Sequence, residues 1–235
     1  MFNYMRLEAW FQLNDAARVE DLLREMDASN SPVRPNSESF SKVIRAWLQD
    51  ELQSPYGLPG TSCENAWRWL KELAQREKQG NSDLGTAPDL FSNVLKTAAM
   101  TSARGDNVLS VGLQTFWAWR ESRFGINSFA YAWLLEIGLK VLSSPKDNKK
   151  REDFIKNLTK HCCKDGLMSK KFVRELADGV VYDEGWTAEE SKRMCDEVLG
   201  EPPFPFQWSR NLPQGQDHPP QPIDLERKNA GADGK

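Results

Sequence analysis

The residues best suited to chemistry form one short run of potential metal ligands, His161-Cys162-Cys163. Imidazole and thiolate groups are the ligands that zinc prefers in proteins. Adjacent residues of a helix point about 100° apart, however, so two neighbouring cysteines do not easily join one compact site. We therefore expect a helix that buries one of these cysteines beside an exposed histidine, and no metal site. Cys63 and Cys195 are each isolated in the sequence. The four cysteines are unevenly spaced, which argues against a disulfide framework.

No catalytic arrangement is recognisable elsewhere in the chain. The run Gly57-Leu58-Pro59-Gly60 predicts a turn rather than a loop that cradles phosphate. The paired acids Glu189-Glu190 lie at the expected start of a helix, where acidic side chains interact favourably with the helix dipole. The sequence therefore predicts no catalytic residue, no cofactor, no small-molecule substrate and no enzymatic activity.

Basic residues are dense between Lys146 and Arg174, and two interpretations of this run are open. One is a face that follows a phosphate backbone; the other is an ordinary solvated helix face. The formal net charge of −3 does not favour bulk phosphate neutralisation, although it leaves room for a local basic surface. If the first interpretation holds, the candidate phosphate contacts are Lys149, Lys150, Arg151 and Lys156.

The elements that would position these residues are helices, and one pattern recurs among them. In 35–47, Phe40, Val43, Ile44 and Trp47 fall at i, i+3, i+4 and i+7, which is one stripe of a helix. Weaker copies of this pattern follow around Phe91 and Tyr131. A unit that recurs along a chain indicates a repeat array. Without two loop insertions, the spacing of the aromatic residues approaches the roughly 34 residues of helix-turn-helix repeats.

The same periodicity predicts an all-α fold, an α-solenoid of helix-turn-helix repeats. We expect repeats in 1–145, a helical C-terminal extension in 146–200, and a proline-rich, largely disordered tail in 201–235, of which 203–208 docks on the helical body. The predicted helices include one or two in 149–178. The others span about 2–13, a segment carrying Val19 to Met26, 37–48 with Asn36 or Ser37 as N-cap, 64–78, 89–103, 108–122, 128–142 and 187–199.

Neither a membrane segment nor a targeting segment is visible. No stretch approaches the roughly 18 apolar residues of a membrane helix, so no membrane partner is expected. The N-terminus lacks both a secretory signal and the Arg-rich look of an organellar presequence. Met1 leads almost directly into an apolar helical pattern, which leaves open that the chain is a fragment of a longer protein. The cysteine usage favours a reducing, intracellular compartment.

These patterns resemble the pentatricopeptide repeat family. In that family a proline and a small polar residue precede an aromatic residue and an aliphatic pair, and the second helix carries a small residue with methionine seven positions later. Segments 34–44 and 19–26 match, whereas Pro88 sits two positions too close to its aromatic residue and Ile126 replaces a proline. The resemblance covers about 1–142. Segments 161–167 and 206–211 resemble the C-terminal extension of pentatricopeptide proteins from diatoms and related algae.

The resemblance implies a single-stranded RNA partner, with one base bound per repeat by side chains on the inner helix face. The implied base-reading residues are those after each aromatic residue, Ser41, Ser92 and Ala132, together with the unit-ending Asn36 and Asn127. Hydroxyl and amide groups both donate and accept hydrogen bonds. By analogy the pair formed by Ser92 and Asn127 would prefer adenine, whereas Ala132 cannot hydrogen-bond. The alternative for each serine is an ordinary polar residue at a helix start.

Two functions are therefore carried forward. The resemblance implies an RNA-binding protein of mitochondria or plastids that acts in RNA processing, stability or translation. The alternative is a non-catalytic scaffold that holds a protein partner in the same helical groove, as the net acidity and the nine tryptophans suggest. Core packing is the simpler role for those tryptophans. The RNA target, the organelle and the oligomeric state stay open at this point.

Overall fold

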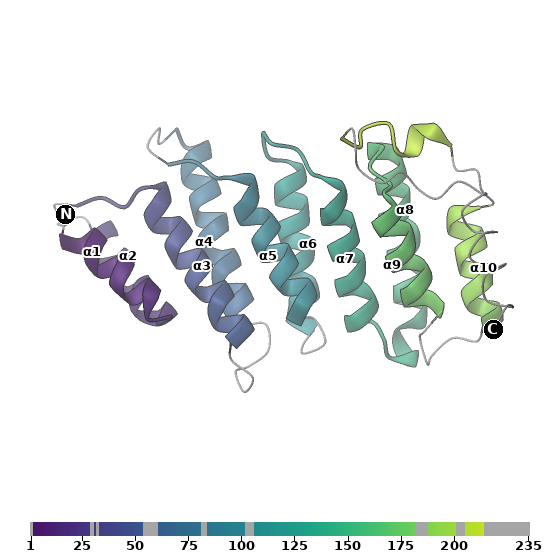
Figure 1. Ribbon diagram of the computed structural model, residues 1–235, viewed down its shortest axis with the longest axis horizontal. Coiled ribbons are helices and arrows are strands. Elements are labelled where there is room, and N and C mark those ends of the chain that lie inside the picture. The colour runs from purple at the N-terminus through teal and green to yellow at the C-terminus, as the bar shows by residue number, and fades with distance from the viewer. Residues whose placement is uncertain are drawn as a thin grey trace, which may run out of the picture. The chain divides into compact units, whose positions relative to one another are not determined.

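The described part of the chain is all-α, with helices that pack in sequential pairs (Figure 1). The structure is a computed structural model, and it describes residues 2–28, 31, 33–53, 61–80, 84–101, 106–181, 188–200 and 205–213. These residues form ten α-helices: α1 (Phe2–Gln12), α2 (Ala16–Asp27), α3 (Ser37–Gln53), α4 (Thr61–Lys78), α5 (Pro88–Thr101), α6 (Asp106–Arg120), α7 (Ser128–Val141), α8 (Asn148–Asp165), α9 (Lys170–Val181) and α10 (Ala188–Leu199).

The chain divides into two compact units, 1–125 and 126–235. In the first unit α1 packs on α2, α3 on α4, and α5 on α6, while α3 also contacts both α1 and α5. In the second unit α7 packs on α8 and α9, and α10 on α8 and α9. This arrangement is consistent with a helical-repeat protein. In the structure α7 packs with the helices that follow it, while the predicted end of the repeats at residue 145 stays a prediction.

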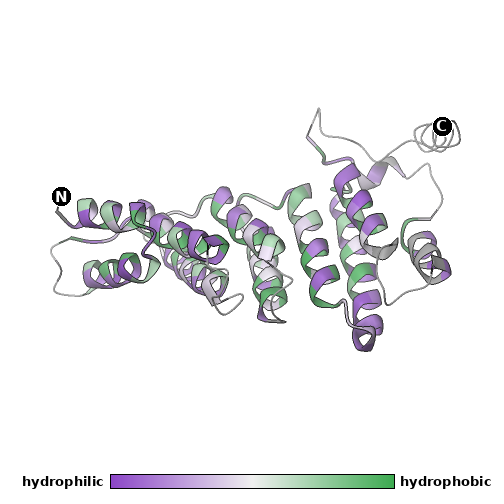
Figure 2. Ribbon diagram, turned by 60° about the horizontal axis from the view of Figure 1, so that its bottom comes forward, coloured by the Kyte–Doolittle hydropathy of each residue, from purple (hydrophilic) through white to green (hydrophobic). Residues whose placement is uncertain are grey.

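The predicted apolar stripes face the interior of each unit, and this burial explains why these segments are helical. Along the helices apolar and polar residues alternate with the helical period (Figure 2). Trp47 is an exception, because it is only half-buried. The buried stripe residues are Val19, Leu22, Leu23, Met26, Phe40, Val43, Ile44, Ala66, Trp69, Leu70, Leu73, Phe91, Val94, Leu95, Phe116, Trp119 and Tyr131.

The connection between α3 and α4 is shorter than the sequence predicts. The prolines and glycines of 49–63 suggest a loop there, but both helices extend into this segment. The cause is a buried carboxylate: Glu51 accepts hydrogen bonds from the backbone N–H of Ser62 and of Cys63, at 3.1 and 3.2 Å. Asp50 accepts the Ser62 hydroxyl at 2.6 Å. The last turn of α3 therefore caps the first turn of α4, which satisfies otherwise unpaired N–H groups.

The end of α8 is completed by a segment from much later in the chain. Gly166 adopts a left-handed conformation (φ 68°) and ends the helix, and the backbone N–H of Leu167 returns to the carbonyl of Cys162 at 3.1 Å. The segment 205–213, which contains the short 3-10 helix η3 (Phe206–Trp208), lies against this turn. We call it the strap.

Four hydrogen bonds fix the strap. Two link backbone groups: the N–H of Met168 donates to the carbonyl of Trp208 at 2.8 Å, and the N–H of Asn211 donates to the carbonyl of Gly166 at 2.9 Å. The side chains of Arg210 and Asn211 donate to the last carbonyls of α8. The two segments that resemble the C-terminal extension, 161–167 and 206–211, thus form one structural feature. The predicted docking is confirmed for 206–208, while 203–204 and 214–235 lie outside the described residues.

Gly166→Ala should destabilise the second unit by about 2 kcal/mol, more than the roughly 1 kcal/mol expected from the left-handed backbone alone. An added Cβ would lie 2.7 Å from Cγ of Arg210 and 3.2 Å from the carbonyl oxygen of Gln207. Urea denaturation followed by circular dichroism measures the loss. Gly200→Ala is the matched control, because Gly200 has φ 69° and nothing within 4 Å of its Cβ position. Equal losses for the two variants would show that the strap adds nothing.

Candidate nucleic-acid interface

Both asparagines of the predicted site are helix N-caps. The Oδ1 atom of Asn36 accepts hydrogen bonds from the backbone N–H and the hydroxyl of Ser39, at 3.0 and 2.9 Å. The Oδ1 atom of Asn127 accepts the backbone N–H of Ala130 at 3.1 Å. The carbonyl end of each amide therefore stabilises α3 or α7. The amide NH₂ group remains as a donor at the mouth of the helix.

The serines of the predicted site differ in what their hydroxyls do. Ser41 is half-buried and donates to the carbonyl of Ser37 at 2.8 Å, a bond within α3. Ser92 is also half-buried, but its hydroxyl has no hydrogen-bond partner among the described residues. Ala132 is fully buried and cannot contact a ligand. Ser92 is therefore the serine whose contact with a base would cost no existing bond.

A cation lies one helical turn after each serine, and sequence reasoning missed this. Arg45 and Lys96 follow Ser41 and Ser92 at i+4, and both are exposed. The guanidinium of Arg45 forms an ion pair with Asp89 at 2.9 Å, which links α3 to the start of α5. The i+4 spacing was the available signal, since residues four apart share a helix face. Two helices that pack side by side (Figure 1) thus present the same pair of groups, a hydroxyl and a cation.

Helix α3, which carries Ser41 and Arg45, is linked to α2 and α4 by one buried carboxylate. Glu20 on α2 accepts the indole N–H groups of Trp47 and Trp69, at 2.8 and 2.9 Å. The guanidinium groups of Arg24 and Arg68 also donate to it, at 2.5 and 2.7 Å. Burial raises the pKa of Glu20, but the hydrogen bonds from Trp69, Arg24 and Trp47 and the charge of Arg68 together bring that pKa below its usual value.

Glu20→Gln should lower the free energy of unfolding by roughly 2 kcal/mol at pH 7, because it removes a buried charge that compensates two guanidinium groups. The folded-state pKa of Glu20 is depressed. The stability that Glu20 contributes is therefore fully present above its unfolded-state pKa of about 4.3, and it is lost as the pH falls through its folded-state pKa. The stability gap between wild type and variant should narrow in urea titrations from pH 7 to pH 3. Glu38→Gln, at an exposed ion pair with Lys42, should change stability by less than about 1 kcal/mol.

Arg151 does not belong to an exposed basic face, contrary to the sequence prediction. Its side chain is 1% exposed, and its Nη2 atom donates to Oδ1 of Asn148 at 2.8 Å. Burial lowers the pKa of its guanidinium. The reason is helical register: Arg151 shares the inward stripe of α8 with Ile155 and Leu158.

The three lysines predicted as phosphate contacts, Lys149, Lys150 and Lys156, are exposed. Lys150 pairs with Asp147 at 2.9 Å. Lys156 pairs with Glu152 and Glu197 at 2.6 and 2.9 Å, and its pKa is raised by these carboxylates, chiefly by Glu152. Two of the three would have to leave a carboxylate to bind phosphate. This surface of α8 is accordingly a weaker candidate than the face of α3 and α5.

The two adjacent cysteines at the end of α8 differ in burial, because neighbouring residues of a helix point in different directions. Cys162 is fully buried and Cys163 is half-buried. Burial raises the pKa of Cys163 to about 11, and burial likewise raises the pKa of Cys63 to about 12. These thiols are therefore protonated near neutral pH. Within the described ranges, no three His, Cys, Asp or Glu side chains are grouped to hold a metal ion.

Two further findings bear on the whole chain. No helix in the described part is both long enough and apolar enough to cross a bilayer. Comparison with protein-family models, with curated proteins and with solved structures gave no match. The candidate interface is thus defined by the arrangement of residues on α3 and α5 and by the sequence resemblance.

Proposed function

We propose that the protein binds single-stranded RNA through pentatricopeptide-type repeats. The observation that carries the proposal is the repeated pair on adjacent first helices, Ser41 with Arg45 and Ser92 with Lys96. In α3 and α5 the serine directly follows a buried aromatic residue and the cation lies four residues later, so the pair recurs in two of the three aromatic units. The third unit has Ala132 and Glu136 at these positions. A ligand that fits such a surface is itself a linear polymer with a regular spacing of bases and phosphates.

The chemistry of these groups suits that ligand. A hydroxyl or an amide NH₂ donates to the edge of an unstacked base, and a cation one turn away neutralises the phosphate that follows. Asn36 and Asn127 keep their donors at the helix mouths because only their carbonyl oxygens serve as caps. By the same resemblance, the RNA is proposed to be organellar and the role to be in processing, stability or translation in mitochondria or plastids.

One observation favours a second candidate, a scaffold for a protein partner. Trp117 and Phe124 are exposed, and an arginine stacks on each ring: Arg120 lies 5.3 Å from Trp117 and Arg123 lies 4.9 Å from Phe124. Tryptophan and arginine are enriched at the energetic centres of protein interfaces. This surface is on α6 and the segment after it, whereas Ser41 and Ser92 are on α3 and α5.

Lys96→Ala should weaken binding to an unstructured RNA pool about equally for all sequences, because a lysine–phosphate contact carries no sequence information. The slope of log K against log salt should fall in magnitude by about 0.7 for this single lost contact. Filter binding across a salt series measures both quantities. Lys71→Ala is the control, since Lys71 is exposed on a second helix, α4. A wild-type chain that binds no RNA even at low salt would contradict the proposal and favour the scaffold.

Ser92→Ala should lower affinity for poly(A) by about 1 to 3 kcal/mol while changing poly(U) binding less, since base-edge contacts carry the sequence preference. Competition crosslinking with the two homopolymers measures the ratio. Ser110→Ala serves as control, because Ser110 is exposed on the second helix α6. An unchanged ratio of poly(A) to poly(U) binding would show that Ser92 does not read a base.

A further inference from the structure

The second unit carries a pair of aromatic rings at its surface, with a lysine above them. Phe129 and Trp133 are one turn apart on α7, and their ring centroids lie 5.8 Å apart with 28° between the ring planes. The ammonium of Lys171, on α9, lies 5.8 and 5.7 Å from the centroids of these two rings. Phe129 is 41% exposed, whereas Trp133 and Lys171 are half-buried. We call these three residues the platform.

The platform carries a positive charge that the described residues leave unpaired. Lys171 forms no ion pair within the described part of the chain, and its contact with the rings orients the ammonium without neutralising it. Lys170 and Arg174, its neighbours on α9, are exposed. Glu175 lies 3.9 Å from Arg174, at the outer limit of an ion pair. An aromatic surface beside several cations fits an acidic ligand that also has apolar side chains.

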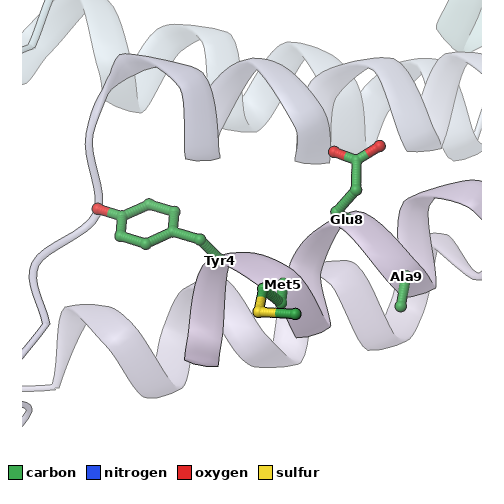
Figure 3. A pocket seen from close by; sticks show the side chains of 4 residues that line it. All are labelled: Tyr4, Met5, Glu8 and Ala9. Carbon is green, nitrogen blue, oxygen red and sulfur yellow. The ribbon is translucent and has the colours of Figure 1, made fainter. Parts of the chain in front are cut away.

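This charge distinguishes the platform from the open hollow on α1, which is lined by Tyr4, Met5, Glu8 and Ala9 (Figure 3). The polar groups of the hollow are already engaged. The hydroxyl of Tyr4 donates to the backbone carbonyl of Arg34 at 2.9 Å, and Glu8 pairs with Lys42 at 3.1 Å. The hollow therefore selects no ligand by its charge, whereas the platform does.

The platform and the strap lie at the same end of the second unit (Figure 1). Tyr131, near the start of α7, donates to the carboxylate of Asp165 at the end of α8, and its ring meets that of Phe172 near the start of α9. The strap meets the same end, because the backbone N–H of Met168, between α8 and α9, donates to the carbonyl of Trp208 at 2.8 Å. The chain therefore leaves the strap beside the helix ends that carry the platform.

The sequence that follows the strap has the chemistry that the platform fits. Residues 217–226 include Asp217, Asp224 and Glu226 but no lysine or arginine. Pro219 and Pro222 are three residues apart, which is the period of a polyproline II helix, so that conformation places both prolines on one face. Proline-rich segments with this spacing dock on surfaces lined by aromatic side chains.

We propose that residues 217–226 dock on the platform of the same chain, with their prolines against Phe129 and Trp133 and their acids facing the cations of α9. The stretch from Pro213 to Pro219 spans up to about 20 Å when extended, roughly twice the distance between packed helices. A short tether gives an effective concentration of the order of millimolar, so even a weak contact is occupied in most molecules. The docked carboxylates compensate the charge of Lys171.

Nuclear magnetic resonance of the ¹⁵N-labelled full chain, without RNA, tests the docking. In the wild type, the amide signals of 223–226 should relax like those of the helical body. Phe129→Ala should reduce the docked fraction at least about threefold, because it removes one of the two rings. Lys171→Ala and added salt should act in the same direction, since each weakens the attraction between opposite charges. Signals of 231–235 are the internal reference.

Phe124→Ala is the matched control, because Phe124 is 39% exposed beside Arg123 in the first unit. It should leave the tail signals unchanged. Asp224→Lys with Glu226→Lys alters the segment and leaves the helical body intact, and it should release the segment as Phe129→Ala does. Circular dichroism checks that every variant is folded.

Four outcomes would overturn the proposal. The signals of 223–226 could be the same in the wild type, in Phe129→Ala and in the variant with two lysines, or Phe124→Ala could release the segment equally. A dependence on protein concentration would place the segment on a second copy, because docking within one chain is independent of concentration. Finally, added single-stranded RNA could shift the indole signal of Trp133 while the tail signals stay constant, which would assign the platform to RNA. The docking itself is measured without RNA and is therefore independent of the proposed function.

Discussion

The carboxylate of Glu20 ties three helices of the first unit together. A buried charge is costly unless it is paired and hydrogen-bonded, and Glu20 is satisfied by two indole and two guanidinium groups. Because these donors come from α2, α3 and α4, one side chain fixes the mutual positions of three helices. It explains why Trp47, at the edge of an otherwise apolar stripe, turns its polar edge inward. The position of α3, and with it the position of Ser41 and Arg45, follows from this contact.

The interface on α3 and α5 combines requirements that compete with each other. Under the proposed function Arg45 would meet a phosphate, but it is also paired with Asp89 on the neighbouring helix. An exposed ion pair of this kind contributes little to stability, so exchanging the carboxylate for a phosphate costs little. Asp89 would then act as an internal competitor for the same cation. Lys96 has no ion-pair partner among the described residues, so under the proposed function its contact with a phosphate would not have to displace a carboxylate, whereas that of Arg45 would.

Periodicity was sufficient to predict most of the helical fold. The stripes around Phe40 and Phe91 are buried as expected, because apolar burial dominates where a helix packs. The predicted loop at 49–63 was wrong at both ends, since the tertiary contact of Glu51 with Ser62 outweighs local composition. The burial of Arg151 was missed because charge density alone does not show which face a residue occupies. Within the candidate site, the N-cap role of Asn36 was predictable from the local sequence. The ion pair of Arg45 with Asp89 was not, because it depends on how α3 and α5 pack.

The strap has a consequence for the order in which the chain folds. Most of the helix pairs form between neighbours in sequence, which favours rapid folding. The last carbonyls of α8 are different, because their donors on Arg210 and Asn211 lie 46 residues later. Closing that loop carries an entropic cost before the hydrogen bonds form. During synthesis, α8 must therefore emerge with an incomplete C-terminus, which is completed only after the strap has left the ribosome.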